Sequence, residues 1–116
     1  MTEPSANLEV FANPAPERDY TIRMTIPEFS CLCPKTGQPD FATLELEYVP
    51  NERCVELKSL KMYLQGYRNI GVFYETLVNR LLDDFVQACL PRKCRVVGCF
   101  TPRGGITTSV TCVYEK

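Results

Sequence analysis

Apolar and polar residues alternate in two stretches in the first half of the chain. The first runs from Asp19 to Phe29, and the second from Ala42 to Val49, where Pro50-Asn51 ends it. A period of two residues is typical of a strand with one buried face, and proline beside asparagine marks a turn. We therefore expect an antiparallel pair of strands, joined by the residues between them.

The apolar residues then take up a helical period. One helix is expected to begin at Leu57 and to end within residues 66–69, and a longer one to run from about Gly71 to Leu90, where Pro91 stops it. Each helix presents one apolar stripe that needs a partner surface. The residues expected to face the core are Leu57, Leu60, Leu64 and Tyr67 in the first helix, and Leu77, Leu81, Phe85 and Cys89 in the second.

Two more strand-like runs, Cys94–Thr101 and Ile106–Tyr114, close the chain. The order of elements predicts an α+β domain over residues 19–116, with two helices on one face of an antiparallel sheet (β2α2β2). Residues 1–18, rich in Pro, Ala, Asn and Glu, are expected to form a flexible N-terminal segment. Because so small a sheet exposes its edge strands, we expect a symmetric oligomer, closed as a barrel, that hides them.

The charges of the chain are nearly balanced, with 13 basic and 14 acidic side chains and no run of like charge. Bulk electrostatics therefore gives no indication of nucleic-acid binding. No apolar segment approaches the length that spans a membrane, and residues 1–18 lack an apolar signal core. These patterns predict a cytoplasmic protein.

Cysteine and histidine usage limits the possible chemistry. The seven cysteines are an odd, scattered set without Cys-x-x-Cys spacing, and the chain has no histidine. Neither a secreted disulfide framework nor a structural metal site is expected, so most of these thiols should be small buried side chains. Cys–His and Ser–His catalysis are excluded, and any proton transfer near neutral pH must use a carboxylate, Lys, Tyr, Cys or water.

The segment Cys33–Asp40 is the first candidate for chemistry. Residues 29–32 are expected to end the first strand, so the segment places a thiol just after that strand and a carboxylate across a loop that Pro34, Gly37 and Pro39 stiffen. A nucleophile needs a proton-handling partner held at close range, and such a loop holds one. The alternative is a turn in which Cys33 is inert, because buried cysteines usually are.

The segment Glu56–Tyr63 is the second candidate. With Leu57 and Leu60 facing the core, Lys58 and Lys61 stand one helical turn apart on a neighbouring face. Two like charges at this spacing repel unless an anion such as a phosphate lies between them. A solvated basic face is the alternative.

Two shorter features remain open on spacing alone. Glu75, beside Tyr74, either complements the dipole of the second helix or accepts hydrogen bonds from a flat heterocycle. The segment Thr101–Gly105 is either a hairpin turn or a phosphate-binding loop that includes Arg103. No Gly-x-Gly-x-x-Gly follows a strand, so a nicotinamide cofactor would not bind in Rossmann fashion.

Taken together, these segments resemble the short form of NADPH-dependent 7-cyano-7-deazaguanine reductase. This family belongs to the tunnelling-fold superfamily, which also contains GTP cyclohydrolase I. The resemblance extends over residues 19–116. It is carried by Cys-Pro-Lys-Thr-Gly-Gln-Pro-Asp at 33–40, Glu-Leu-Lys-Ser-Leu-Lys-Met-Tyr at 56–63, Arg68-Asn69, Glu75 and Thr-Pro-Arg-Gly-Gly at 101–105.

The resemblance implies a nitrile reductase of queuosine biosynthesis that uses two NADPH in succession. Cys33 would form a covalent thioimide with the nitrile carbon, and Asp40 would protonate the nitrile nitrogen. The family assembles around a tunnel as pentamers, often paired as decamers, with active sites between subunits. The remaining residues implied by the resemblance are Val55, Glu56, Leu57, Tyr74 and Glu75 for the substrate, and Lys58, Ser59, Lys61 and Arg103 for NADPH.

Two positions depart from the usual pattern of this family. Tyr74 stands where its members usually carry histidine, and Leu77 stands where some carry a resolving cysteine. Two alternatives to the reductase stay open, the second of them suggested by Tyr74. One is the amidine-forming archaeal relative that acts on nitrile-bearing tRNA, and the other is a purine-binding member without activity.

Overall fold

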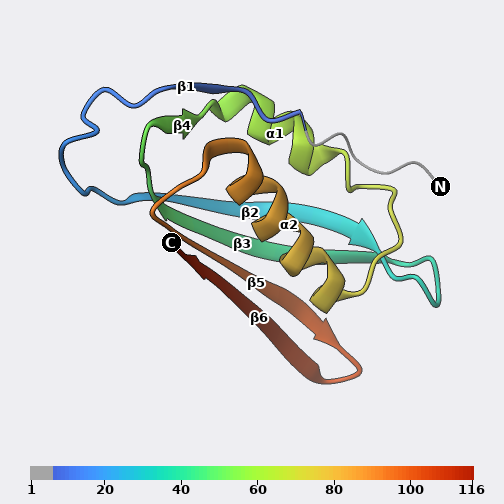
Figure 1. The fold of residues 1–116 in the computed structure, drawn as a ribbon. Helices are drawn as coiled ribbons and strands as arrows, with labels where there is room; N and C mark the ends of the chain where they lie inside the picture. The colour runs from blue at the N-terminus through green and yellow to red at the C-terminus, as the bar shows by residue number, and fades with distance from the viewer. Residues whose placement is uncertain (1–6) are drawn as a thin grey trace.

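A four-stranded antiparallel sheet forms the body of the protein. The computed structural model describes residues 7–116. Both helices lie on one face of the sheet, whose strand order is β2-β3-β5-β6 (Figure 1). The bounds are Ile22–Leu32 for β2, Pro39–Val49 for β3, Leu57–Gln65 for α1, Tyr74–Cys89 for α2, Lys93–Arg103 for β5 and Ile106–Glu115 for β6. The predicted α+β architecture is therefore confirmed.

The sheet forms because its inner strand β3 buries every second side chain against the helices. In β3 the buried apolar residues are Ala42, Leu44, Leu46 and Tyr48, and their neighbours face outward. Leu46 pairs with Val96 of β5 in the same layer. The first strand ends at Leu32 as predicted, but the second begins at Pro39 instead of Ala42, so only residues 33–38 form their connecting loop.

The second helix supplies most of the cover for this face. Leu77, Val78, Leu81 and Phe85 lie on its buried side. It begins at Tyr74 rather than at the predicted Gly71, because the residues before it pair with the end of β2. Leu32 donates to the carbonyl of Ile70 at 2.9 Å and accepts from the amide of Val72 at 3.1 Å. This pairing fixes the start of α2 beside the loop at residues 33–38.

The first helix buries less than its sequence suggested. Leu60 and Leu64 are buried as predicted, but Leu57 is 66% exposed, so its predicted place in the core is wrong. Leu57 is the first residue of α1, directly after the N-cap Glu56, and it lines an open cavity between β2 and α1. Tyr67 lies beyond the end of the helix but is fully buried.

A second, two-stranded sheet was not predicted. It pairs β1 (Val10–Ala12) with β4 (Arg53–Val55), and both strands are too short to show a period. The buried Asn13 fastens the same segment, because its side chain donates to the carbonyl of Asn51 at 2.7 Å. Residues 7–18 are therefore packed against the domain. Residues 1–6 of the predicted N-terminal segment lie outside the described part of the chain.

Phe85→Ala is expected to cost about 3–5 kcal/mol of unfolding free energy. Phe85 is 1% exposed and meets Tyr48 edge to face, with ring centroids 4.7 Å apart. Urea unfolding checks this value. Gln87→Ala, on the exposed side of the same helix, should change stability by less than about 0.5 kcal/mol. Equal effects in the two variants would contradict the placement of the core.

Candidate active site

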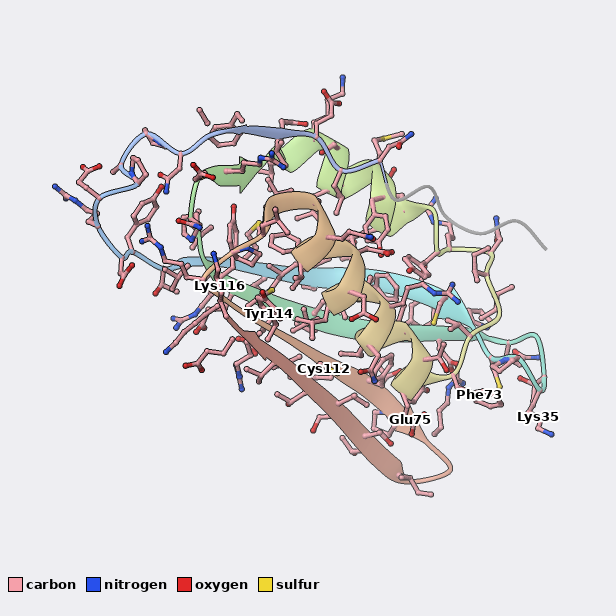
Figure 2. The ribbon with its side chains drawn as sticks, in the orientation of Figure 1. Lys35, Phe73, Glu75, Cys112, Tyr114 and Lys116 are labelled. Atoms are coloured by element: carbon pink, nitrogen blue, oxygen red, sulfur yellow. The ribbon has the colours of Figure 1, made fainter. Side chains whose placement is uncertain are left out.

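Five of the predicted site residues meet at one end of the sheet. They line a cavity of about 380 Å³ between the loop after β2, the start of α2 and the end of β5. Figure 2 shows Lys35, Phe73 and Glu75 at this end of the molecule. The structure thus brings together residues that are far apart in the sequence: Cys33, Asp40, Tyr74, Glu75 and Arg103.

A tight loop fixes the position of Cys33. The strand β2 ends one residue before it. The amide of Cys33 donates to the carbonyl of Gln38, and the amide of Gly37 donates to the carbonyl of Cys33, both at 2.8 Å. Gly37 has a φ of 72°, which a glycine adopts without strain. The hydroxyl of Thr36 accepts from the amide of Gln38 at 3.1 Å, which adds a third bond inside the loop.

The same loop stabilises the thiolate of Cys33. Hydrogen bonds from the Thr36 hydroxyl, and from the amides of Thr36 and Lys35, lower the pKa of Cys33, although burial and the charge of Asp40 oppose them. By contrast, burial raises the pKa of Cys31 to about 11 and that of Cys94 to about 12. Since the thiolate is the nucleophilic form, Cys33 is distinguished from these buried thiols as a candidate nucleophile.

Thr36→Val is expected to raise the pKa of Cys33, since the side-chain hydrogen bond is the first cause of its lowering. A higher pKa means less thiolate at neutral pH, so alkylation by iodoacetamide should slow severalfold there. At alkaline pH the rates of variant and parent should converge. Thr36→Ser keeps the hydroxyl and should behave like the parent. Peptide mass mapping follows Cys33 separately from the exposed Cys99, and an unchanged pH profile would contradict this role of Thr36.

Asp40 is buried, with 4% of its surface exposed, and carries an ion pair. Its Oδ1 atom accepts from Nε of Arg103 at 3.0 Å. The same guanidinium donates through Nη2 to the carbonyl of Pro39. In this chain Arg103 therefore lies beside the carboxylate of the Cys33 cavity, and its predicted contact with NADPH stays a prediction.

Tyr74 completes this cluster from the first turn of α2. Its ring stacks on Phe100, with centroids 3.6 Å apart and planes 8° from parallel. Burial first, and then the charge and hydrogen bonding of Asp40, raise the pKa of the Tyr74 phenol. Glu75, the next residue, is exposed and lines the same cavity. Phe100 was missed by the sequence reasoning, because only the fold brings it to Tyr74.

The segment Val55–Leu57 lies at the opposite end of the sheet (Figure 1). The amide of Val55 donates to the hydroxyl of Tyr48 at 3.0 Å. Tyr48 and Asp40 are on the same strand, and at about 3.4 Å per residue this places them roughly 27 Å apart. A single chain therefore does not bring the predicted substrate residues of this segment to Cys33.

Polar atoms at the start of α1 are engaged in capping. The carboxylate of Glu56 accepts from the amides of Lys58 and Ser59, at 2.7 and 2.8 Å, which lowers the pKa of Glu56. The hydroxyl of Ser59 donates to the carbonyl of Glu56 at 2.8 Å and accepts from the amide of Glu9 at 2.9 Å. The single hydrogen-bond donor of the Ser59 side chain is therefore already used within the fold. The predicted roles of Glu56 and Ser59 in ligand binding stay predictions.

A second cavity, of about 570 Å³, lies between β2 and α1. Lys61 lines it together with Arg68, and both side chains are exposed. Lys58 is exposed on the same helix but does not line the cavity. Arg68 had been given no site role from the sequence, and its position in the resembling segment Arg68-Asn69 was the available signal.

Two absences bear on the class of site. Within residues 7–116, no cluster of three or more histidine, cysteine or acidic side chains is arranged to hold a metal ion. In the same residues, no helix is long and apolar enough to cross a membrane.

Comparisons with known proteins agree with this geometry. The family of QueF-like proteins matches residues 39–116. The NADPH-dependent 7-cyano-7-deazaguanine reductase of Nitrosococcus oceani is 59% identical over 115 residues, which cover 99% of this chain and 89% of the relative. The reductase of Halorhodospira halophila is 63% identical over 109 residues, which cover 94% and 92%. The chain therefore belongs to the QueF-like family, and the resemblance to these reductases is confirmed.

A solved structure also shares the fold. The archaeosine synthase QueF-Like, in its apo form, superposes with a TM-score of 0.77 at 20% identity, covering 83% of this chain and 94% of the other. The predicted fold class, an α+β tunnelling fold, is thereby confirmed. Its closure into an oligomeric barrel stays a prediction.

Proposed function

We propose that this protein reduces the nitrile of 7-cyano-7-deazaguanine to an aminomethyl group, with NADPH as reductant, in queuosine biosynthesis. One observation carries the proposal: Cys33, with its lowered pKa, shares a cavity with the buried carboxylate of Asp40. Relatives that carry the name of this reductase match nearly the whole chain at about 60% identity. The reaction adds four hydrogen atoms, two as hydride and two as protons, in two reduction steps.

The first step is the capture of the nitrile by Cys33. Its S–H bond breaks and a sulfur–carbon bond forms, while one π bond of the nitrile opens to leave C=N. The thiol proton passes to the carboxylate of Asp40 and then to the nitrile nitrogen, so no atom is oxidised or reduced. Covalent capture turns a weakly electrophilic nitrile into a C=N carbon that accepts hydride more readily.

Glu75 is placed to orient the heterocycle, because its exposed carboxylate lines the cavity beside Tyr74. Glu75→Ala is expected to raise the dissociation constant of the nitrile by roughly tenfold to a hundredfold, since hydrogen bonds to a charged group contribute about 1.5–3 kcal/mol. The turnover number should fall less. Titration calorimetry with the Cys33→Ala protein measures binding without reaction. Asp83→Ala, farther along the same helix, should bind like the parent, and an unchanged constant in Glu75→Ala would contradict the proposed role.

The cofactor would be held by the basic side chains of α1 and the segment after it. NADPH carries phosphates, and Lys58, Lys61 and Arg68 are exposed cations, two of them at the cavity between β2 and α1. The donor set therefore fits a phosphate-bearing group. When bound, NADPH supplies the hydride for each reduction step. The protein's own residues orient the C=N carbon and exclude water.

A complete site needs more than one chain. The roughly 27 Å between Asp40 and the end of β3 keeps Val55–Leu57 away from Cys33 in one copy. Both edge strands of the sheet, β2 and β6, are also without a partner on their outer side in the described chain. In a pentamer or decamer, Val55–Leu57 of one subunit would lie next to Cys33 of the neighbouring subunit. The same assembly would pair the free edges of the sheets. Seven free thiols and an NADPH-dependent reaction fit a cytoplasmic location.

The amidine-forming alternative uses the same fold, and the archaeosine synthase QueF-Like shares it at only 20% identity. The fold alone therefore does not separate the two activities. The higher identity to the reductases, and the presence of Lys58 and Lys61, favour the reductase. The balanced charge of the chain gives no support for a tRNA substrate.

Oxidation of NADPH in the presence of 7-cyano-7-deazaguanine tests this function. Two NADPH should be consumed for each aminomethyl product, as followed by absorbance and mass spectrometry. A nitrile adduct without NADPH consumption would favour the amidine-forming alternative. If the protein binds the nitrile but forms neither adduct nor product, it is a binding member of the family.

A further inference from the structure

The N-terminal strand β1 and the start of α1 are joined through Glu9, and Figure 1 shows β1 beside β4 and α1. In the pairing of β1 with β4, Val10 lies opposite Val55. The carbonyl of Glu9, one residue earlier, accepts from the amide of Glu56, the N-cap of α1, at 2.8 Å. The amide of Glu9 donates to the hydroxyl of Ser59 at 2.9 Å, across 50 residues of sequence. One residue outside α1 therefore bonds both to its N-cap and to its first turn.

The first turn of α1 depends on contacts of this kind for its order. The helix has nine residues, and a helix of that length is not stable alone in water. In its first turn, Ser59 and Leu60 are buried, whereas Leu57, Lys58 and Lys61 are exposed. Apolar packing therefore covers only part of this turn. The bonds to Glu9 hold the side of the turn that faces β1.

The segment that carries Glu9 is also fastened at its other end, by Asn13. This residue is 6% exposed, and its side-chain amide donates to the carbonyl of Asn51 at 2.7 Å. Its Oδ1 atom accepts from the amide of Ala15 at 3.0 Å and from the hydroxyl of Tyr20. Residues 9–13 are therefore fixed at both ends, and they form what we call the N-terminal strap.

We propose that Ser59 is a positioning residue, whose hydroxyl joins the N-terminal strap to the first turn of α1 and so orders Lys58 and Lys61 for NADPH. The inference rests on the proposed function, and it assigns Ser59 to the strap rather than to a contact with NADPH. The hydroxyl already donates its one proton to the carbonyl of Glu56 at 2.8 Å. A phosphate oxygen accepts hydrogen bonds, so it would need this same proton. Order in the backbone before binding lowers the entropy that the two lysines lose when they bind phosphate.

The dissociation constant of NADPH, measured by its fluorescence without nitrile, tests the proposal. Ser59→Ala removes the hydroxyl and Glu9→Pro removes the amide that donates to it, and each should raise the constant roughly fivefold, the usual effect of one hydrogen bond. The double variant should bind no more weakly than either single variant, because both changes break the same bond. Glu9→Ala keeps the backbone amide and loses only an exposed side chain, so it should match the parent. Parental affinity in either Glu9→Pro or Ser59→Ala, or additive losses of about twenty-fivefold in the double variant, would overturn the proposal.

Hydrogen exchange of residues 56–65 needs neither nitrile nor NADPH, so it separates this inference from the proposed function. Glu9 lies outside this segment, and the intrinsic exchange rates of the segment are therefore the same in all Glu9 variants. Exchange should be severalfold faster in Glu9→Pro than in the parent and in Glu9→Ala, while α2 exchanges as in the parent. Unchanged exchange in Glu9→Pro would overturn the inference, even if the protein reduces the nitrile. Faster exchange confined to this segment would support the strap, even if the protein proved to form amidines.

Discussion

Cys33→Ala is expected to abolish both the covalent adduct and the NADPH turnover. Of the seven thiols only Cys33 lines the cavity, and Cys31, two residues away, is 1% exposed with a pKa that burial raises to about 11. The remaining binding surface cannot activate a nitrile without a nucleophile. Turnover should therefore fall to the background of the assay, as measured by NADPH oxidation and by detection of the aminomethyl product.

The control for this variant is Cys99→Ala. Cys99 is exposed on β5, outside the cavity, and its removal should leave adduct and turnover as in the parent. Both variants should unfold at temperatures close to that of the parent, since neither thiol belongs to the core. An adduct that survives in Cys33→Ala would remove Cys33 from the mechanism.

Asp40→Asn is expected to lower the turnover number by roughly a hundredfold to ten-thousandfold, the usual contribution of general acid–base catalysis. The amide has nearly the same shape but cannot carry the proton from Cys33 to the nitrile nitrogen. Arg103, its half-exposed partner, can turn toward water, so stability should change much less than activity. Single-turnover kinetics separates slow adduct formation from slow reduction.

Glu45→Gln provides the matched comparison on the same strand. Glu45 points to the opposite face of β3 from Asp40, as the alternating burial shows. The Glu45→Gln variant should therefore retain the turnover of the parent. If Asp40→Asn kept more than about a tenth of the turnover, general acid–base catalysis by this carboxylate would be excluded.

The strong periods in the sequence predicted most of the fold. Alternation in β3 and the helical stripe of α2 were sufficient, because each element buries one face against the other. The prediction that Leu57 faces the core failed because the apolar stripe of a helix does not show how far along the helix the covering surface extends. The strands β1 and β4 were missed because three residues show no period.

The candidate site, too, could be predicted from the sequence only in part. Cys33 and Asp40 were predicted as neighbours because a short loop in the sequence brings them together. The contact of Asp40 with Arg103 could not be predicted, since it depends on the pairing of β3 with β5 and on a shift of register in the last hairpin. The stacking of Tyr74 on Phe100 likewise depends on where α2 lies over β5. Local patterns therefore predicted the candidate reacting groups, whereas the side chains that contact them could be found only from the fold.

The most direct measurement is the mass of the protein after incubation with 7-cyano-7-deazaguanine in the absence of NADPH. Capture of the nitrile predicts an increase by the full mass of the nitrile, located by peptide mapping on Cys33, and its disappearance when NADPH is added. An unchanged mass, or an adduct on another cysteine, would contradict a covalent mechanism at Cys33.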